Sequence, residues 1–460
     1  MMADMEEKSM EAIVSLCKRR GFIFQGSEIY GGLAGTWDYG PLGLMLKNNI
    51  SEAWWRRFVD RRDDMYGIES AILMNKRIWE ASGHVGGFHD PLVEDKKTHK
   101  RYRADHLLEE HGIDPSGMSL EDIGKTITEK GIRSPEGNEL TEPQQFNMMF
   151  RSSIGPVEGD EHTVYLRPET AQGMFVNFKN IVDAYHPKLP FGIAQIGKAF
   201  RNEIAPRDFI FRVRELEIME LEYFMPESQW QELFSYWQTE MHAWFALLGF
   251  AKDDIKEVEV PAQERAHYSK RTLDFYFRYP MGFKEIAGLA YRTDFDLRSH
   301  MTHSGVELHY TDPVSNEKLL PHVLEPTFGL GRHLLAVITK AYTTDTVGGE
   351  ARTYLRFPPH LSPIKVAVFP LLKNKPELVE KAKAVYRMLK PELYHVMWDD
   401  NGNIGKRYRR QDEIGTPWCI TIDFDTLADN TVTLRDRDSA SQERVSLEEL
   451  LSLLREKLAV

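Results

Sequence analysis

The chain has 460 residues, which is too many for one ordinary hydrophobic core, so the length predicts two or three domains. Hydrophobic residues make up 42% and charged residues 28% of the sequence, a balance that excludes a mainly disordered protein. The net charge of −12 argues against a protein that coats nucleic acid non-specifically, but it leaves room for a local basic groove.

The sequence also carries no membrane or secretion signal. No apolar run approaches the roughly 18 residues of a spanning helix, and residues 1–22 lack the apolar core of a signal peptide. Cys17 and Cys419 are the only cysteines, which excludes a disulfide scaffold and a cysteine-based zinc site. We therefore expect a cytoplasmic protein that has no membrane partner.

Residues 41–59 predict a long helix with Pro41 in its favoured first position. Apolar residues recur along it at helical spacing: Leu46, Ile50, Trp54 and Phe58. An acid-rich region then interrupts strand-like sequence, and we expect an insertion over about residues 95–160. Inside it, Ser119 and Asp122 form a capping-box pattern, and Gly131 marks the end of the helix that follows.

Short strands with polar interruptions fill residues 162–345, and their short turns favour an antiparallel sheet. Three prolines between residues 356 and 363 predict a linker. Beyond it, strands and helices alternate as in an α/β domain. The sequence thus predicts an α+β domain over residues 1–355 and a second, α/β domain over residues 364–460.

The stretch 199–220, AFRNEIAPRDFIFRVRELEIME, predicts two strands around a polar loop, yet it carries charges of both signs. Arg201 and Glu203 are two residues apart and would share one face of a strand, as would Arg212 and Arg214 on the return strand. Guanidinium groups suit phosphate, and a carboxylate can hold a metal or an amine. The alternative is a ladder of salt bridges on an exposed sheet face.

Two helix starts also carry charged residues. Glu169 falls where a strand gives way to a helix, which is equally an ordinary place for an acidic residue. Gly329 and Gly331 open an apolar helix that has Arg332 in its first turn, so backbone N–H groups and a guanidinium could bind an anion there. Those glycines could equally serve a tight turn.

Two further charged positions leave alternatives open. Glu285 stands in an otherwise apolar strand and, if buried, needs a metal or an arginine such as Arg292 as its partner. Residues 405–412, GKRYRRQD, surround Tyr408 with basic side chains. They fit either a nucleic-acid contact with base stacking or a solvated helix face.

The order of these stretches is more specific than any one of them. YGPLG, FRNE and GLGR, in sequence order, resemble the three signature motifs of class II aminoacyl-tRNA synthetases. YRADH, RPETAQG, RTDFDL and EPTFGLGR closely resemble glycyl-tRNA synthetases of the homodimeric kind. The resemblance covers practically the whole chain.

The resemblance implies a fold and an activity. The fold is a class II catalytic domain over residues 1–355, with an antiparallel sheet flanked by helices, and an anticodon-binding domain over residues 364–460. The activity is ATP-dependent attachment of glycine to tRNA(Gly) through a glycyl-adenylate. A homodimer with the Pro41 helix near its interface is expected, as is Mg²⁺. Zinc is not expected, because the cysteines that some relatives carry in the insertion are missing.

The resemblance also assigns nucleotide-binding residues. Arg201 is expected at the α-phosphate of ATP and Arg332 at the terminal phosphates, and these two with Glu203 form the expected catalytic set. Glu285 is the candidate magnesium ligand. The full expected ATP-binding set is Arg201, Asn202, Glu203, Phe211, Arg212, Val213, Arg214, Glu215, Leu216, Glu285, Ile286, Gly329, Leu330, Gly331 and Arg332.

Glycine offers only an ammonium, a carboxylate and two hydrogens, so its pocket must bind mainly through carboxylates around the amine. The residues that match the glycine site of the family are Arg103, Glu169, Leu216, Glu217, Ile218, Met219, Glu220, Glu325, Pro326, Thr327, Phe328 and Gly329. The anticodon is expected at Lys406, Arg407, Arg409 and Arg410.

Two rival functions fit parts of this pattern. One is a catalytically dead relative that keeps the fold as a binding protein, like the accessory subunit of mitochondrial DNA polymerase. It would not need the ATP-contacting arginines, but Arg201, Arg212 and Arg332 are all present. The other is a class II synthetase for a different amino acid, which the carboxylate-rich segments disfavour.

Overall fold

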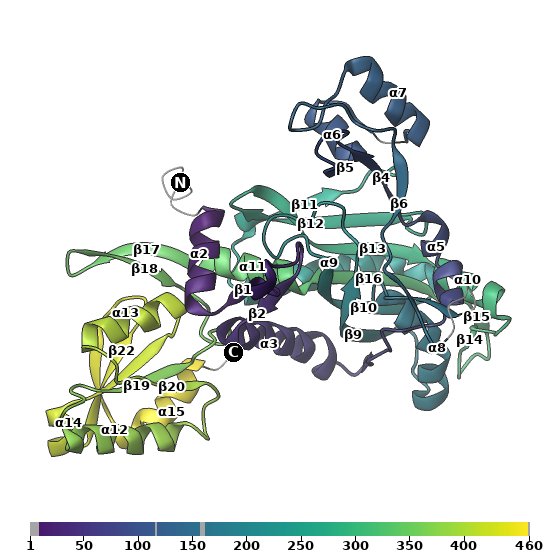
Figure 1. The fold of residues 1–460 in the computed structure, drawn as a ribbon. Coiled ribbons are helices and arrows are strands. Elements are labelled where there is room, and N and C mark those ends of the chain that lie inside the picture. The colour runs from purple at the N-terminus through teal and green to yellow at the C-terminus, as the bar shows by residue number, and fades with distance from the viewer. Residues whose placement is uncertain (1–8, 116, 157–161, 459–460) are drawn as a thin grey trace.

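The computed structural model describes residues 9–115, 117–156 and 162–458 (Figure 1). Residues 157–160 of the predicted insertion and the outermost residues of both predicted domains lie outside the described residues. No helix among the described residues has both the length and the apolar character needed to cross a membrane.

A seven-stranded sheet forms the centre of the molecule, in the order β11-β12-β13-β16-β10-β9-β3. Every neighbouring pair is antiparallel except β3 and β9, which run parallel. The predicted antiparallel sheet is therefore confirmed. The strands are β3 (Met65–Gly67), β9 (Phe191–Phe200), β10 (Glu215–Met225), β11 (Ile255–Glu259), β12 (Arg271–Tyr279), β13 (Gly282–Thr293) and β16 (His322–Gly329).

Helices flank this sheet, and the predicted helix at residues 41–59 is among them. It forms α3 (Pro41–Trp55), which continues as a π-helical turn (Arg56–Asp60). Its apolar stripe is fully buried, and Trp54 and Phe58 pack against Phe328 of β16 with ring centroids 6.0 and 5.5 Å away. The other flanking helices are α2 (Met10–Arg20), α8 (Ala171–Tyr185), α9 (Trp230–Leu247), α10 (Phe295–Ser304) and α11 (Leu330–Ala341).

A small unit with a hydrophobic core of its own projects from the central sheet, at the top of Figure 1. Its helix α7 (Leu120–Lys130) begins with the predicted capping box of Ser119 and Asp122, and it ends at Gly131 in the left-handed conformation. A three-stranded sheet and one more helix complete the unit: β4 (His89–Glu94), β5 (Arg101–Arg103), β6 (Gln144–Asn147) and α6 (Ala104–Glu110).

The C-terminal region contains every strand and helix that the alternating pattern predicts, and also α14 and β23, which it did not. Its sheet has the order β20-β19-β21-β22-β23, with β19, β20 and β21 parallel and the other pairs antiparallel. The elements are β19 (Val366–Pro370), α12 (Pro376–Leu389), β20 (Val396–Trp398), α13 (Ile404–Ile414), β21 (Trp418–Ile422), α14 (Phe424–Asp429), β22 (Thr431–Asp436), β23 (Gln442–Ser446) and α15 (Leu447–Leu458).

The expected linker, residues 356–363, has no helix or strand, but it is not an exposed tether. Phe357, Leu361 and Ser362 are buried, and the backbone oxygen of Phe357 accepts a hydrogen bond from Arg437. The remaining short strands and α-helices are β1 (Ile23–Gln25), β2 (Trp37–Tyr39), α4 (Lys76–Ala81), α5 (His84–Gly87), β7 (Arg151–Ser153), β8 (Thr163–Tyr165), β14 (Tyr310–Thr311), β15 (Lys318–Leu319), β17 (Tyr342–Val347) and β18 (Glu350–Leu355).

Candidate active site

The charged stretch at residues 199–220 is not the simple hairpin that its pattern predicts. β9 ends at Phe200 and β10 begins at Glu215, so the expected placement of Arg201, Glu203, Arg212 and Arg214 on strands is wrong. The chain turns between them through residues 208 and 209, whose φ angles are both 60°. The backbone N–H of Arg201 still donates to the oxygen of Arg214 at 2.9 Å. The first and last residues of the loop are therefore hydrogen-bonded to each other just beyond the two strands.

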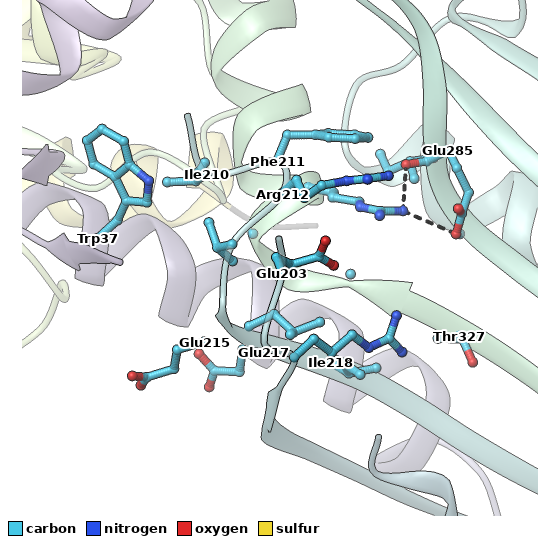
Figure 2. A pocket seen from close by; sticks show the side chains of 18 of the residues that line it. Trp37, Glu203, Ile210, Phe211, Arg212, Glu215, Glu217, Ile218, Glu285 and Thr327 are labelled. Atoms are coloured by element: carbon cyan, nitrogen blue, oxygen red, sulfur yellow. Dashed lines mark hydrogen bonds and ion pairs between the residues drawn. The ribbon is translucent and has the colours of Figure 1, made fainter. Parts of the chain in front are cut away.

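This loop, together with β10, β13, β16 and the start of α11, encloses a cavity of about 960 Å³ that is open to solvent (Figure 2). In Figure 2, Glu203 and Arg212 lie near its centre, with Trp37 on one side and Glu285 on the other. The cavity is lined by Trp37, Tyr39, Arg201, Glu203, Ile210, Phe211, Arg212, Val213, Glu215, Leu216, Glu217, Ile218, Glu285, Ile286, Ala287, Thr327, Gly329, Gly331 and Arg332.

Arg332 comes from the first turn of α11 and is held in place from two sides. Its Nη1 lies 3.1 Å from the carboxylate of Glu285, and its guanidinium lies over the ring of Phe211 at 4.5 Å. Dashed lines in Figure 2 mark its contacts with Glu285. The partners considered for a buried Glu285 were a metal or an arginine such as Arg292. Glu285 lies at the cavity wall with 46% of its side chain exposed, and its arginine partner is Arg332 instead of Arg292.

Three guanidinium groups line the cavity, those of Arg201, Arg212 and Arg332. Burial lowers the pKa of Arg212, and the charges of Arg103, Arg207 and Arg332 lower it further, against the opposing effect of Glu203. Arg201 lines the same cavity and donates from Nε to the backbone oxygen of Pro168 at 3.1 Å. Guanidinium groups that repel one another stabilise an anion placed between them, and phosphate fits their geometry.

Two acidic groups, Glu203 in the cavity lining and Asp274 beside Glu285, have the character of cation ligands. Oε2 of Glu203 is buried and finds no hydrogen-bond donor in the described part of the chain. Asp274, on β12, has its pKa raised to about 7 by burial and by the nearby charge of Glu285. Carboxylate oxygens of this kind are the ligands that Mg²⁺ prefers.

A second group of ionisable side chains is buried deeper, on the far side of Thr327. Glu220 accepts hydrogen bonds from the hydroxyls of Thr170 and of Thr327, the latter at 2.7 Å. Glu325 accepts from Arg292 at 2.8 Å, and burial raises the pKa of Glu325 to about 8. Because Thr327 also lines the cavity, its hydroxyl connects the two groups.

Glu169 lies at the edge of this acidic group and has a partner of its own. Nε2 of His84 is 3.2 Å from its carboxylate, and Nε2 of Gln172 donates to it at 2.9 Å. Although burial opposes ionisation, His84 and Arg292 hold the pKa of Glu169 below its usual range. Glu169 is therefore an anion near neutral pH.

The structure does not bring all of the expected residues to the cavity. Arg103 is in the projecting unit, where it pairs with Asp90 at 2.9 Å and with Asp105 at 2.5 Å. The carboxylate of Glu217 lines the cavity but pairs with Lys47 at 2.7 Å. Glu169, Glu220 and Glu325 are also outside the lining, in the buried acidic group. The other expected residues outside it are Asn202, Arg214, Met219, Pro326, Phe328 and Leu330; of these, Met219, Phe328 and Leu330 belong to the hydrophobic core.

Sequence reasoning also missed several residues. Trp37 and Tyr39 line the cavity from β2, a strand too short to give a periodic signal. Glu222 and Asp296 join the buried acidic group, and Arg292 pairs with both Asp296 and Glu325. Glu222 could have been found, because it follows Glu220 at a spacing of two on the same strand and so shares its face.

The basic run expected at the anticodon forms helix α13, and its members differ in environment. Arg407 is 1% exposed and donates to the backbone oxygens of Pro370, Asp400 and Gly402. Arg410 forms a two-pronged pair with Asp399. Arg409 is within 3.3 Å of Glu350, whereas Lys406 is exposed.

Tyr408, the expected stacking surface of this run, is also occupied. Its ring is covered by the guanidinium of Arg435 at 4.7 Å, and its hydroxyl lies 2.6 Å from that of Thr421. A nucleic-acid base therefore has no free face of Tyr408 on that side to stack on.

Comparison with known proteins agrees with this geometry. Residues 156–341 match the tRNA synthetase class II core domain (G, H, P, S and T), and residues 365–457 match an anticodon binding domain. The glycine–tRNA ligase of Clostridium tetani is 49% identical over 98% of this chain and 99% of its own length. Those of Deinococcus radiodurans and Thermus thermophilus are 47% and 46% identical over 99% of this chain and all of their own length. The chain has a class II core and an arginine-rich cavity, and these relatives are 46–49% identical to it over nearly its whole length. The chain therefore belongs to the glycine–tRNA ligase family.

Proposed function

We propose that the chain attaches glycine to tRNA(Gly) in two steps, first forming glycyl-adenylate and pyrophosphate from glycine and ATP, then passing the glycyl group to the tRNA. The observation that carries the proposal is the shared wall between the arginine-rich cavity and the buried carboxylates. Thr327 lines the first and donates to Glu220 in the second, so a nucleotide and a small amine can lie next to each other.

In the first step, a carboxylate oxygen of glycine attacks the α-phosphorus of ATP and pyrophosphate leaves. The protein supplies alignment and charge neutralisation more than covalent chemistry. We assign Arg201 to the α-phosphate. Arg332, fixed between Glu285 and Phe211, is assigned to the terminal phosphates, because a preorganised guanidinium loses little freedom on binding.

Magnesium is part of this proposal. The donor set fits it, since Glu285 is partly exposed at the cavity and one oxygen of Glu203 is buried without a donor among the residues described. When bound, the ion would help to neutralise phosphate charge. Glu285 and Glu203 are the residues that would hold it.

The ammonium of glycine is assigned to the buried carboxylates. Glu169 is held as an anion by His84 and Arg292, and Glu220 accepts two hydroxyl donors that orient its oxygens. Glu325 completes the set. We favour Glu220 over Glu217 for this role because Glu217 is already paired with Lys47.

The remaining expectations are proposed on the strength of the resemblance. They are a homodimer with α3 near its interface, a cytoplasmic location, a division into domains at residues 356–363, and an anticodon contact at α13. The matches to a synthetase core and to an anticodon binding domain support the division of labour between the two regions.

Glycine-dependent exchange of labelled pyrophosphate into ATP tests the activity. We expect exchange with glycine and none with alanine or serine, whose side chains do not fit a site built for two hydrogens. No exchange with any amino acid would support a catalytically dead relative. Exchange with another amino acid but not with glycine would support a class II synthetase for a different amino acid.

A further inference from the structure

Glu222 is a buried acid that the proposed function does not use. It lies on β10 two residues beyond Glu220, and its side chain is 0% exposed. Neither of its carboxylate oxygens has a hydrogen-bond partner within the described ranges. An isolated carboxylate anion is very costly in such a place, so Glu222 calls for either a proton or a cation.

The three nearest carboxylates are not equivalent. Oxygens of Glu220, Glu222 and Glu325 all lie within 4.8 Å of one another. Glu220 receives two hydroxyl hydrogen bonds and Glu325 receives one from Arg292, and each of these stabilises an anion. Glu222 receives none, so a proton shared by the group is most stable on Glu222.

The surrounding charges favour the same assignment. Four charged side chains act on Glu222 from the elements packed around it: Glu220 on β10, Glu325 on β16, Arg292 on β13 and Asp296 on α10. β9 adds no charge opposite Glu222, because its paired residue there is Ile193. Burial, and three acids against one guanidinium, raise the pKa of Glu222 well above its usual range.

We propose that Glu222 carries a proton while the carboxylate group is empty and gives that proton to solvent when the ammonium of glycine enters beside Glu220 and Glu325. The proposal rests on the proposed function, since it needs glycine at this site. A positive charge at about 5 Å raises the ionisation constant of a buried carboxyl by roughly two orders of magnitude or more. Glu222 is thus a positioning residue: its proton offsets the repulsion of the empty site, and its anion then holds the ammonium.

Glycine binding should depend on pH in one direction. A binding step that releases a proton becomes more favourable as pH rises, until Glu222 is ionised in the free protein as well. The ammonium of free glycine keeps its proton near neutral pH and does not contribute. The Kd for glycine should therefore fall as pH rises from about 6 to 8, by at most about tenfold per unit for one proton.

Calorimetric titration of the full chain with glycine tests this, in two buffers of different ionisation enthalpy and after EDTA treatment to exclude a metal. We expect between about 0.5 and 1 proton released per glycine at pH 7, and less than about 0.2 in Glu222→Gln, which keeps the shape but has no proton to lose. Glu232→Gln, at an exposed position on α9, is the matched control and should keep the wild-type proton count.

The outcomes separate the two proposals. If wild-type protein binds glycine without releasing protons, or Glu222→Gln binds it with the wild-type proton count, the role of Glu222 is overturned while the proposed function stands. If wild-type protein binds no glycine, both are overturned. Should Glu222→Gln fail to fold, a wild-type Kd that does not change between about pH 6 and 8 is enough to reject the proton role.

Discussion

Two arginine-rich segments of this chain have similar compositions and opposite structural roles. The loop between β9 and β10 presents Arg201 and Arg212 to a cavity. Helix α13 presents Arg407 and Arg410 to its own domain, where backbone oxygens and Asp399 accept their hydrogen bonds. A count of basic residues does not separate the two.

The difference lies in what surrounds each segment. The loop extends past the ends of two strands. Arg214 there donates to the backbone oxygens of Glu203 and Ala34, whereas Arg201 has one backbone acceptor, at Pro168, and lines the cavity together with Arg212. α13 packs on a sheet, near the carbonyl of Pro370 at the end of β19 and the turn at residues 400–402, which supply acceptors. An arginine is available to a ligand to the extent that the fold leaves its guanidinium donors without internal acceptors.

The sharpest test of the structural role is Asp412, which belongs to α13 and is 0% exposed. Its carboxylate binds Arg435 at 2.8 and 3.0 Å and Arg352 at 3.2 Å. Asp412→Ala leaves the buried guanidinium of Arg435 without its anion, and it removes one carboxylate from Arg352, which keeps Asp345. The loss should cost about 3–5 kcal/mol of stability in the C-terminal sheet. Native-state hydrogen exchange across residues 365–457 measures it.

The control for that experiment is Asp425→Ala, an exposed acid on α14, which should change stability by less than about 1 kcal/mol. Pyrophosphate exchange by Asp412→Ala should stay near the wild-type rate below its unfolding temperature. A stable Asp412→Ala protein would mean that the charges of this region are not structural, and the comparison would fail.

For the cavity, the expected effect is on catalysis. Arg201→Ala should lower the rate of glycine-dependent pyrophosphate exchange by about 100-fold or more, because a preorganised contact with the transition state is lost. The melting temperature should change little, since the side chain of Arg201 makes one hydrogen bond in the described structure, to the backbone oxygen of Pro168. Steady-state exchange kinetics and thermal denaturation together measure both.

Arg207→Ala provides the matched control, because Arg207 is in the same loop but half-exposed, and it is absent from the cavity lining. It should keep near-normal exchange. Near-normal kinetics for Arg201→Ala would remove Arg201 from its assigned role, and an equal loss in both variants would point to a general effect of loop charge.

Much of the fold could be predicted from the sequence because its signals are local. Periodic apolar residues and a first-position proline predicted α3, and a capping box with a closing glycine predicted α7. The C-terminal alternation of strands and helices was confirmed in the same way. The strand assignment at residues 201–214 failed because the chain is left-handed at both Asp208 and Phe209, and phenylalanine is not a residue that indicates such a turn.

The candidate site was harder to predict from the sequence because it depends on contacts between segments that are distant along the chain. The sequence singled out Glu285 and Arg332 separately, but their pairing needs β13 to lie beside α11. Likewise, nothing local connects His84 with Glu169, or Arg292 with Glu325. The resemblance supplied most residues of the ATP cavity, whereas the pairing of Arg292 with Glu325 and the lack of a hydrogen-bond partner for Glu222 among the described residues emerged only from the structure.

The smallest expected effect is on the KM for tRNA, and it distinguishes the exposed basic residues of α13 from the buried ones. Lys406 is exposed and Arg409 is partly exposed, so they are the members of the basic run that can still reach a phosphate. Replacing both with alanine should raise the KM for tRNA by about 3- to 10-fold and flatten its salt dependence, while ATP–glycine activation is unchanged. Aminoacylation at several salt concentrations, beside pyrophosphate exchange, measures the two effects.

Arg407→Ala is the informative contrast within the same helix. It leaves three backbone oxygens without their donor and should destabilise the domain by about 1–3 kcal/mol, with KM for tRNA unchanged once the protein is folded. If instead Arg407→Ala raised KM and left stability untouched, the buried arginine would be a tRNA contact. Availability to a ligand could then not be deduced from internal hydrogen bonding, which is the assumption that separates α13 from the β9–β10 loop.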